Sequence, residues 1–327
     1  MRKNVISTSG PPIFRRFLYL RTILSISYGI TLYNKSKYIS RVLDAVLAEC
    51  QRTGGEIIIY DDVSTDESVE IVRAKLLDGP IRLIEGDRNR GVVAATERLI
   101  REARQPLLRL VDADDEIVAG SSGFLAAALD RHDAILAVGG CIDRPVEPVP
   151  VADSPSSALV PEPFERFARG IDFNLSGALM RTAEAVAILP LPTELRLAQD
   201  VCVALRLARR GNVARVAAIA SLQPSEIENR LSRRVAAMYR DICLVLAAEI
   251  ERSRSADAAA IVRRQAARCL RYFRREAPAA LTRADRLALY RHRWTSLLCP
   301  VPTAQARLRR IARIYAGDEQ RVLGRAA

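Results

Sequence analysis

Histidine and tryptophan are scarce in this chain. Its 327 residues include 2 histidines and 1 tryptophan, and aromatic residues make up 5% of the total. Because His132 and His292 are the two histidines of the chain, a catalytic triad that contains histidine is not expected.

Closely spaced cysteines are also missing. The chain contains 6 cysteines, none in a C-x-x-C pair and none beside a histidine cluster. This spacing argues against a zinc site and against a disulfide framework. Free thiols are typical of a reducing compartment, so we expect a cytoplasmic protein.

No apolar run reaches the roughly 20 residues that a bilayer span needs. The most apolar stretch, residues 17–32, is interrupted by Arg21. Pro11 and Pro12 break the basic N-terminus, and no small-residue cleavage site follows. We therefore expect neither a membrane span nor a signal peptide, and we interpret residues 1–23 as an N-terminal extension.

The composition is that of a globular protein with a basic surplus. Hydrophobic residues make up 49% and charged residues 27% of the chain, and the net charge is +12. This length suits one large domain and a smaller one. A basic surplus fits an anionic partner, which could be nucleic acid, acidic lipid or a phosphorylated substrate.

Apolar periodicity predicts strands that alternate with helices up to about residue 224. The predicted strands are residues 24–32, 56–60, 81–84, 107–111, 134–138 and 213–220. This alternation predicts an α/β domain over residues 24–224, with a mainly parallel sheet flanked by helices. Residues 225–327 read as a basic helical C-terminal region, with helices over 231–250, 256–275, 283–291 and 304–315. We interpret residues 141–165 as a loop and residues 117–130 as a helix.

The most informative stretch is residues 106–116, PLLRLVDADDE. A short apolar strand runs directly into Asp112, Asp114 and Asp115. Ligands of open α/β sheets bind beyond the carboxyl ends of the strands, and hard divalent ions take carboxylate oxygens shared with phosphates. The stretch alone is compatible with a metal–diphosphate site or with a polar turn.

Four further polar segments stand at predicted element boundaries. They are residues 31–34 (TLYN), 61–66 (DDVSTD), 89–91 (NRG) and 199–200 (QD). Together with 112–115 (DADD), their order and spacing resemble glycosyltransferase family 2, which consists of inverting, nucleotide-sugar-dependent enzymes with the GT-A fold, a Rossmann-like α/β fold. The resemblance covers roughly residues 24–220.

The resemblance implies a donor site. Residues that match its donor-binding positions are Thr31, Tyr33, Asp61, Asp62, Asn89, Gly91, Asp112, Ser176 and Gly177. Thr31 and Tyr33 would contact the base, and Asp62 with Asp61 would accept the base N–H, typically of uracil. Asp112, Asp114 and Asp115 would bind Mn²⁺ or Mg²⁺ on the diphosphate. Asp200 would be the catalytic base that deprotonates an acceptor hydroxyl.

Some positions depart from the family pattern. Thr31-Leu32 stands where proline is common, Val63 stands where Gly, Ala or Asn is common, and Gln199 replaces the usual acidic residue before the base. No Q-x-x-R-W segment follows downstream, so a processive synthase of the cellulose type is not favoured.

Three functions are therefore weighed. The leading one is a glycosyltransferase that moves a sugar from a nucleotide sugar, typically a UDP-sugar, to an acceptor hydroxyl with inversion, in polysaccharide or glycan assembly. The second is a nucleotidyltransferase. Such an enzyme is expected to have a glycine-rich phosphate loop near the first strand, and no such loop follows residues 24–32. The third is a non-catalytic protein that binds nucleic acid or lipid through its arginine-rich helices.

The C-terminal helices carry arginines together with Tyr272, Phe273 and Trp294. Such helices could lie on an anionic membrane surface, at the inner face of the membrane, which would suit a lipid-linked acceptor. The alternative is a solvated face whose apolar side packs on the catalytic domain or on a second subunit in a homodimer. A glycan acceptor is equally compatible, and no nucleic-acid partner is expected.

Overall fold

The computed structural model describes residues 24–144, 154–170, 174–224, 235–252, 254–276, 281–294 and 300–326. Within these ranges strands and helices alternate up to about residue 224, and helices follow. The predicted α/β class is confirmed. The predicted N-terminal extension, residues 1–23, lies outside the described residues.

The strands of this part of the chain form one mixed sheet. They are β1 (Ile26–Leu32), β2 (Gly55–Asp61), β3 (Ile81–Glu85), β4 (Leu107–Asp112), β5 (Glu116–Ile117), β6 (Ala134–Asp143), β7 (Ser157–Leu159), β8 (Ala178–Arg181) and β9 (Asn212–Gln223). Their order is β3-β2-β1-β4-β8-β6-β9-β5, and β7 pairs with β9. The first four strands are mutually parallel, so their carboxyl ends lie at one edge.

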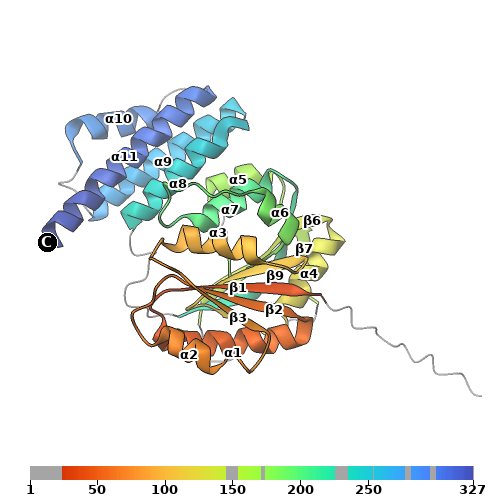
Figure 1. Cartoon of the computed structure of the whole chain (residues 1–327). Helices are drawn as coiled ribbons and strands as arrows, with labels where there is room; N and C mark the ends of the chain where they lie inside the picture. The colour runs from red at the N-terminus through yellow and green to blue at the C-terminus, as the bar shows by residue number, and fades with distance from the viewer. Residues whose placement is uncertain are drawn as a thin grey trace, which may run out of the picture.

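Helices cover both faces of the sheet (Figure 1). Helices α1 (Ser36–Thr53), α2 (Ser68–Ala74) and α4 (Ser121–Arg131) share one apolar core with one face. Helices α3 (Val92–Glu102), α5 (Pro163–Arg169), α6 (Thr182–Ala187) and α7 (Gln199–Ala208) share the other core. Burial on both faces explains why the strands are continuous apolar runs such as residues 57–59, III.

The structure corrects two predictions. Ile117 was expected to begin a helix, but it pairs with Ser221 in the short strand β5, and α4 begins four residues later. Residues 141–165 were expected to be a loop, but the described part includes the end of β6, all of β7 and the start of α5. The strand segments in both corrections pair with β9, and a local pattern does not reveal such distant partners.

The predicted C-terminal helices are present as α8 (Val235–Glu249), α9 (Ser255–Glu276), α10 (Arg283–Trp294) and α11 (Val301–Ala326). Leu246, Ile261 and Leu308 from these helices share a core with Phe164 of α5 and Leu205 of α7. The helices therefore pack on the α5–α7 side of the sheet (Figure 1). Among the described helices, none combines the length and apolarity of a membrane span. The boundary at residues 224/225 stays a prediction.

Candidate active site

The polar segments singled out in the sequence converge at the carboxyl ends of β1, β2 and β4. Thr31 of β1 lies opposite Asp112 of β4 in the parallel register, and the Thr31 hydroxyl donates to Asp112 Oδ1 over 3.3 Å. On the other side of β1, Leu32 lies opposite Asp61 of β2. The sheet therefore places the Thr31, Asp61 and Asp112 segments side by side.

The acidic segment after β4 carries more negative charge than its surroundings neutralise. Lys35 Nζ, at the start of α1, lies 2.5 Å from Asp114 Oδ2. Burial raises the pKa of Asp112 well above its usual value, and the negative charges of Asp115, Asp114 and Asp200 raise it further, while Lys35 lowers it. The electrostatics thus place Asp200 in the same group of carboxylates as the predicted metal ligands.

Asp200 sits in the first turn of α7 and is partly exposed. Its Oδ1 accepts the N–H of Val201 over 2.7 Å, which favours the ionised form, but burial is the larger effect and raises the Asp200 pKa to about 6. A carboxylate with a pKa near the working pH is suited to general-base chemistry. The position and chemistry of Asp200 thus fit the role that the resemblance implies.

The segment from Asn174 to Gly177 supports the acidic segment from the β8 side. Asp112 N donates to Ser176 Oγ over 3.1 Å. Asn174 Nδ2 donates to Asp115 Oδ2 over 3.1 Å, and its Oδ1 accepts the N–H groups of Ser176 and Gly177. Ser176 and Gly177 are therefore close to the acidic segment, and Asn174, which is not among the predicted site residues, lies with them.

The two aspartates after β2 organise the loops around the site. Both oxygens of buried Asp62 accept backbone N–H groups, from Arg90 over 2.8 Å and from Gly91 over 2.7 Å. Asp61 instead holds its own turn by accepting the N–H groups of Val63 and Ser64. The structure thus brings Asp62 together with the loop that contains Asn89 and Gly91. Asp61 stabilises the turn that follows β2.

Tyr33 and Asn34 form the outer wall of this region. The Tyr33 side chain is 46% exposed, so its ring is accessible to a flat partner. Asn34 Oδ1 accepts the N–H of Thr65 over 2.7 Å, and Asn34 N donates to Ser64 Oγ. The segment after β1 is therefore tied to the loop after β2, and Tyr33 is left open beside it.

Arg109 lies under the site and is fully buried in the middle of β4. Its guanidinium donates to the carbonyl oxygens of Ser176 and Ala220 and to the hydroxyls of Ser121 and Ser122. Burial lowers the Arg109 pKa to about 10, which leaves the group charged at neutral pH. Arg109 is not among the predicted site residues, although a charge inside an apolar strand indicates that buried partners are needed.

The acidic segment suits a hard divalent ion that shares its coordination with a substrate. Within the ranges described above, no three Asp, Glu, His or Cys side chains are close enough to enclose an ion by themselves. Mg²⁺ commonly uses one or two carboxylates, water and substrate phosphates instead of a full protein cage. The carboxylates of Asp112, Asp114 and Asp115 supply ligands of that kind, and their mutual repulsion favours a bound cation.

The chain resembles known glycosyltransferases in part of its sequence. It is 36% identical over 98 residues to the succinoglycan biosynthesis protein ExoU of Rhizobium meliloti, which covers 29% of this chain and 28% of ExoU. It is 29% identical over 115 residues to the glycosyltransferase GlyG of Streptococcus pneumoniae, which covers 35% of this chain and 38% of GlyG. The matches thus span about a third of the length of these relatives.

Solved structures show the same fold over most of the chain. TarS residues 1–349 of S. aureus, in complex with UDP-GlcNAc, align with a TM-score of 0.64 and 18% identity over 90% of this chain and 92% of that one. The mannosyltransferase PcManGT of Pyrobaculum calidifontis, with GDP-Man and Mn²⁺, aligns with a TM-score of 0.52 and 18% identity over 90% and 87%. The fold is therefore GT-A.

The sequence model of the family described as Glycosyl transferase family 2 matches residues 27–177. The match runs from β1 to the Ser176–Gly177 turn and so includes the acidic segment and the loops after β1 and β2. Residues 27–177, just under half of the chain, therefore match glycosyl transferase family 2.

Proposed function

We propose that this protein is a glycosyltransferase that moves a sugar from a nucleotide sugar to an acceptor hydroxyl with inversion. The observation that carries the proposal is the grouping of four carboxylates, Asp112, Asp114, Asp115 and Asp200, around one partly compensating lysine, Lys35. Such a group is costly to fold unless a cation and a reacting substrate use it.

Asp200 would act as the base. In its ionised form it takes the proton of the acceptor hydroxyl while the acceptor oxygen forms a bond to the anomeric carbon. The bond from that carbon to the diphosphate oxygen breaks, and its electron pair leaves with the nucleoside diphosphate. Attack from the face opposite to the leaving group inverts the anomeric centre.

Asp112, Asp114 and Asp115 would hold a divalent ion against the donor diphosphate. When bound, Mn²⁺ or Mg²⁺ would supply Lewis-acid stabilisation of the leaving group. Lys35 already contacts Asp114, so its ammonium group lies where it can also approach a phosphate. Ser176 and Asn174 keep the acidic segment in place through Asp112 N and Asp115.

The nucleotide would lie over the loops after β1 and β2. Tyr33 is exposed there and offers a ring for stacking on the base. Asp62 retains lone pairs beyond those used by Arg90 and Gly91, so it can still accept a base N–H. The UDP-GlcNAc complex of TarS supports a UDP-sugar donor, and the GDP-Man complex of PcManGT makes GDP the alternative.

The acceptor would be a glycan or a lipid-linked glycan in polysaccharide assembly. Support comes from ExoU and a second succinoglycan biosynthesis protein of the same organism, ExoO, 32% identical over 109 residues. Both names refer to polysaccharide biosynthesis.

Calorimetric titration of UDP and GDP, with Mn²⁺ and with EDTA, tests the proposal. We expect binding of one nucleotide that needs the metal and that is lost in Asp114→Asn. The matched control Asp130→Asn removes an acid at the end of α4 whose side chain is 77% exposed, and it should bind normally. If neither UDP nor GDP binds to the folded wild type in the presence of Mn²⁺, the proposed function is refuted.

A further inference from the structure

Helix α10 exposes a stripe of large apolar side chains. Leu287 is 72% exposed, Tyr290 51% and Trp294 75%. Successive residues of an α-helix are rotated by about 100°, so positions three and seven residues apart lie on the same side. The three side chains therefore form one stripe, which we call the α10 stripe.

The opposite side of the same helix is buried. Ala288, Leu289 and His292 form the buried side of α10, and Leu289 belongs to the core shared with α9 and α11. The α10 stripe is therefore not a core face that has lost its partner within this chain. The helix is already anchored through one side and presents a second apolar side outward.

Figure 1 places α10 on the outer side of the C-terminal helices, on the side remote from the sheet. Nothing that the proposed chemistry uses lies on this helix. The α10 stripe thus needs an explanation separate from the active site.

Arginines frame the α10 stripe. On the helix, Arg286 and Arg293 project to one flank and Arg291 to the other, and all three are exposed. The guanidinium of Arg293 lies 5.4 Å from the centre of the Trp294 ring. Burial lowers the pKa of His292 to about 4, and Arg307 and Arg310 of α11, together with Arg291, are near enough to lower it further.

The sequence of α10 has one carboxylate, Asp285, and four arginines, Arg283, Arg286, Arg291 and Arg293. Its single carboxylate, Asp285, accepts a hydrogen bond from the Thr282 hydroxyl at the start of the helix over 2.6 Å. The outward surface of α10 therefore combines apolar and aromatic side chains with a net positive charge.

We propose that α10 docks this protein on an anionic lipid bilayer. Leu287, Tyr290 and Trp294 would enter the headgroup region, where aromatic side chains are favoured, and the flanking arginines would bind lipid phosphates. A second copy of this chain is a poorer occupant because its α10 carries the same positive charge. Nucleic acid would satisfy the arginines but would leave Leu287 in water.

Trp294 makes the proposal directly measurable because it is the single tryptophan of the chain. Its emission should shift to the blue when the full-length protein is mixed with phosphatidylcholine vesicles containing phosphatidylglycerol. Vesicles of phosphatidylcholine alone should cause a much smaller shift, and added salt should reverse the binding. Co-sedimentation with the same vesicles gives an independent readout.

The test variant is Leu287→Ser combined with Tyr290→Ser, which retains the Trp294 reporter. We expect vesicle affinity to fall tenfold or more. The matched control is Leu77→Ser, because Leu77 is 99% exposed and lies after α2, on the other face of the sheet. Arg286→Gln with Arg293→Gln provides a second variant that keeps the stripe; it should weaken binding and reduce its dependence on salt.

Three results would overturn the proposal. They are an unchanged Trp294 emission with anionic vesicles, equal affinity of the serine variant and the wild type, and a blue shift that depends on protein concentration without vesicles. The last result would assign the α10 stripe to self-association. None of these measurements uses nucleotide or sugar transfer, so the outcome is separate from that of the proposed function.

Discussion

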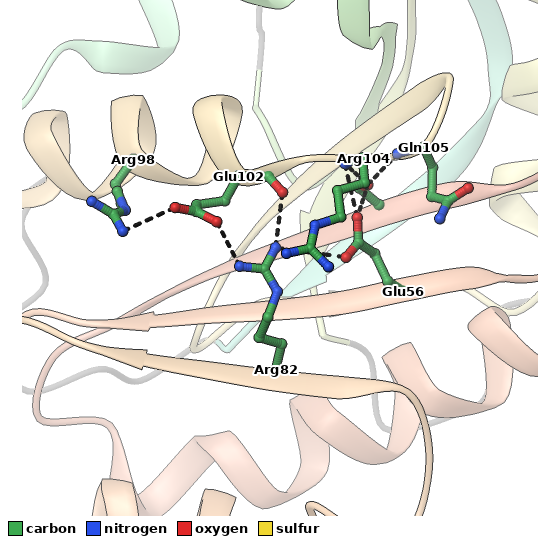
Figure 2. A network of polar contacts seen from close by, with 7 residues as sticks. Glu56, Arg82, Arg98, Glu102, Arg104 and Gln105 are labelled. Carbon is green, nitrogen blue, oxygen red and sulfur yellow. Dashed lines mark hydrogen bonds and ion pairs between the residues drawn. The ribbon is translucent and has the colours of Figure 1, made fainter.

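The two edges of the parallel half of the sheet handle charge in opposite ways. At the amino edge, Glu56 of β2 accepts hydrogen bonds from Ser27 and from the Arg104 backbone, over 2.8 Å each (Figure 2). Arg82 bonds Glu102 over 2.6 Å and lies 3.6 Å from Glu56, and Arg98 bonds Glu102 over 2.9 Å. Each carboxylate there has an arginine partner.

The carboxyl edge instead brings several carboxylates close to one another. Lys35 is the cation that acts on Asp112, against the charges of Asp115, Asp114 and Asp200. The pKa values differ between the edges: Arg82 lowers the pKa of Glu102, whereas burial raises the pKa of Asp112 and of Asp200, and neighbouring negative charges raise that of Asp112 further. A balanced network stabilises the fold, and an unbalanced one is available for a ligand.

The largest expected effect comes from removing the base at the carboxyl edge. Asp200→Asn should lower kcat by about 10² to 10⁴, which is the usual contribution of a general base. Nucleotide binding should persist because Asp200 is not among the proposed metal ligands. Steady-state transfer assays with the donor identified by calorimetry measure the effect.

The pH profile of the wild type sharpens this prediction. The base must be ionised, so with a pKa of about 6 for Asp200 the rate should fall as pH drops through that value. The control Asp130→Asn should show the same profile as the wild type. Full activity of Asp200→Asn would contradict the assignment.

The two edges should also differ in their effect on stability. Replacing Asp112 by Asn removes a carboxyl group whose folded-state pKa is raised, so the free energy of unfolding at pH 7.5 should rise. The sign follows because the wild-type native state binds the Asp112 proton more tightly than the unfolded state does. The wild type therefore loses stability as pH rises from the unfolded-state pKa of Asp112 through its raised folded-state pKa. Thermal unfolding in EDTA measures the change, and a clear loss of stability would contradict it.

At the amino edge, removing a charged side chain should instead lower the free energy of unfolding. Arg82→Met removes the ion pairs with Glu102 and Glu56, and because these side chains are partly exposed we expect a loss of about 1 kcal/mol. The Glu102 pKa is lowered in the fold, so the stability from this ion pair is fully present above the unfolded-state pKa of Glu102. It is lost as pH falls through the folded-state pKa. Denaturant unfolding at pH 7 and pH 4 should show a smaller difference between variant and wild type at pH 4. Catalytic rate should not change.

Much of the carboxyl edge could be predicted from sequence because it follows from local patterns. An apolar strand that ends in Asp112, and a helix that begins at Gln199-Asp200, fix both positions without knowledge of distant contacts. The same reasoning could not find which acid Lys35 meets, or that Asn174 bonds Asp115, since both depend on loop paths. The short strand β5 was missed for the same reason: its partner, Ser221, is more than a hundred residues away.

The smallest expected effect concerns Val63, where the sequence departs from the family pattern. Val63 has a φ of 67°, in the left-handed region that a β-branched residue adopts only at a cost of roughly 1–2 kcal/mol. Asn tolerates this conformation better, so Val63→Asn should raise the free energy of unfolding by about 0.5–1 kcal/mol. Thermal unfolding measures the gain, and Val69→Asn, at a buried helical position, should instead destabilise. If Val63→Asn also leaves nucleotide affinity unchanged, the strained backbone at this edge has no part in holding the donor; a weaker affinity would mean that the valine shapes the loop that Asp61 and Asp62 organise.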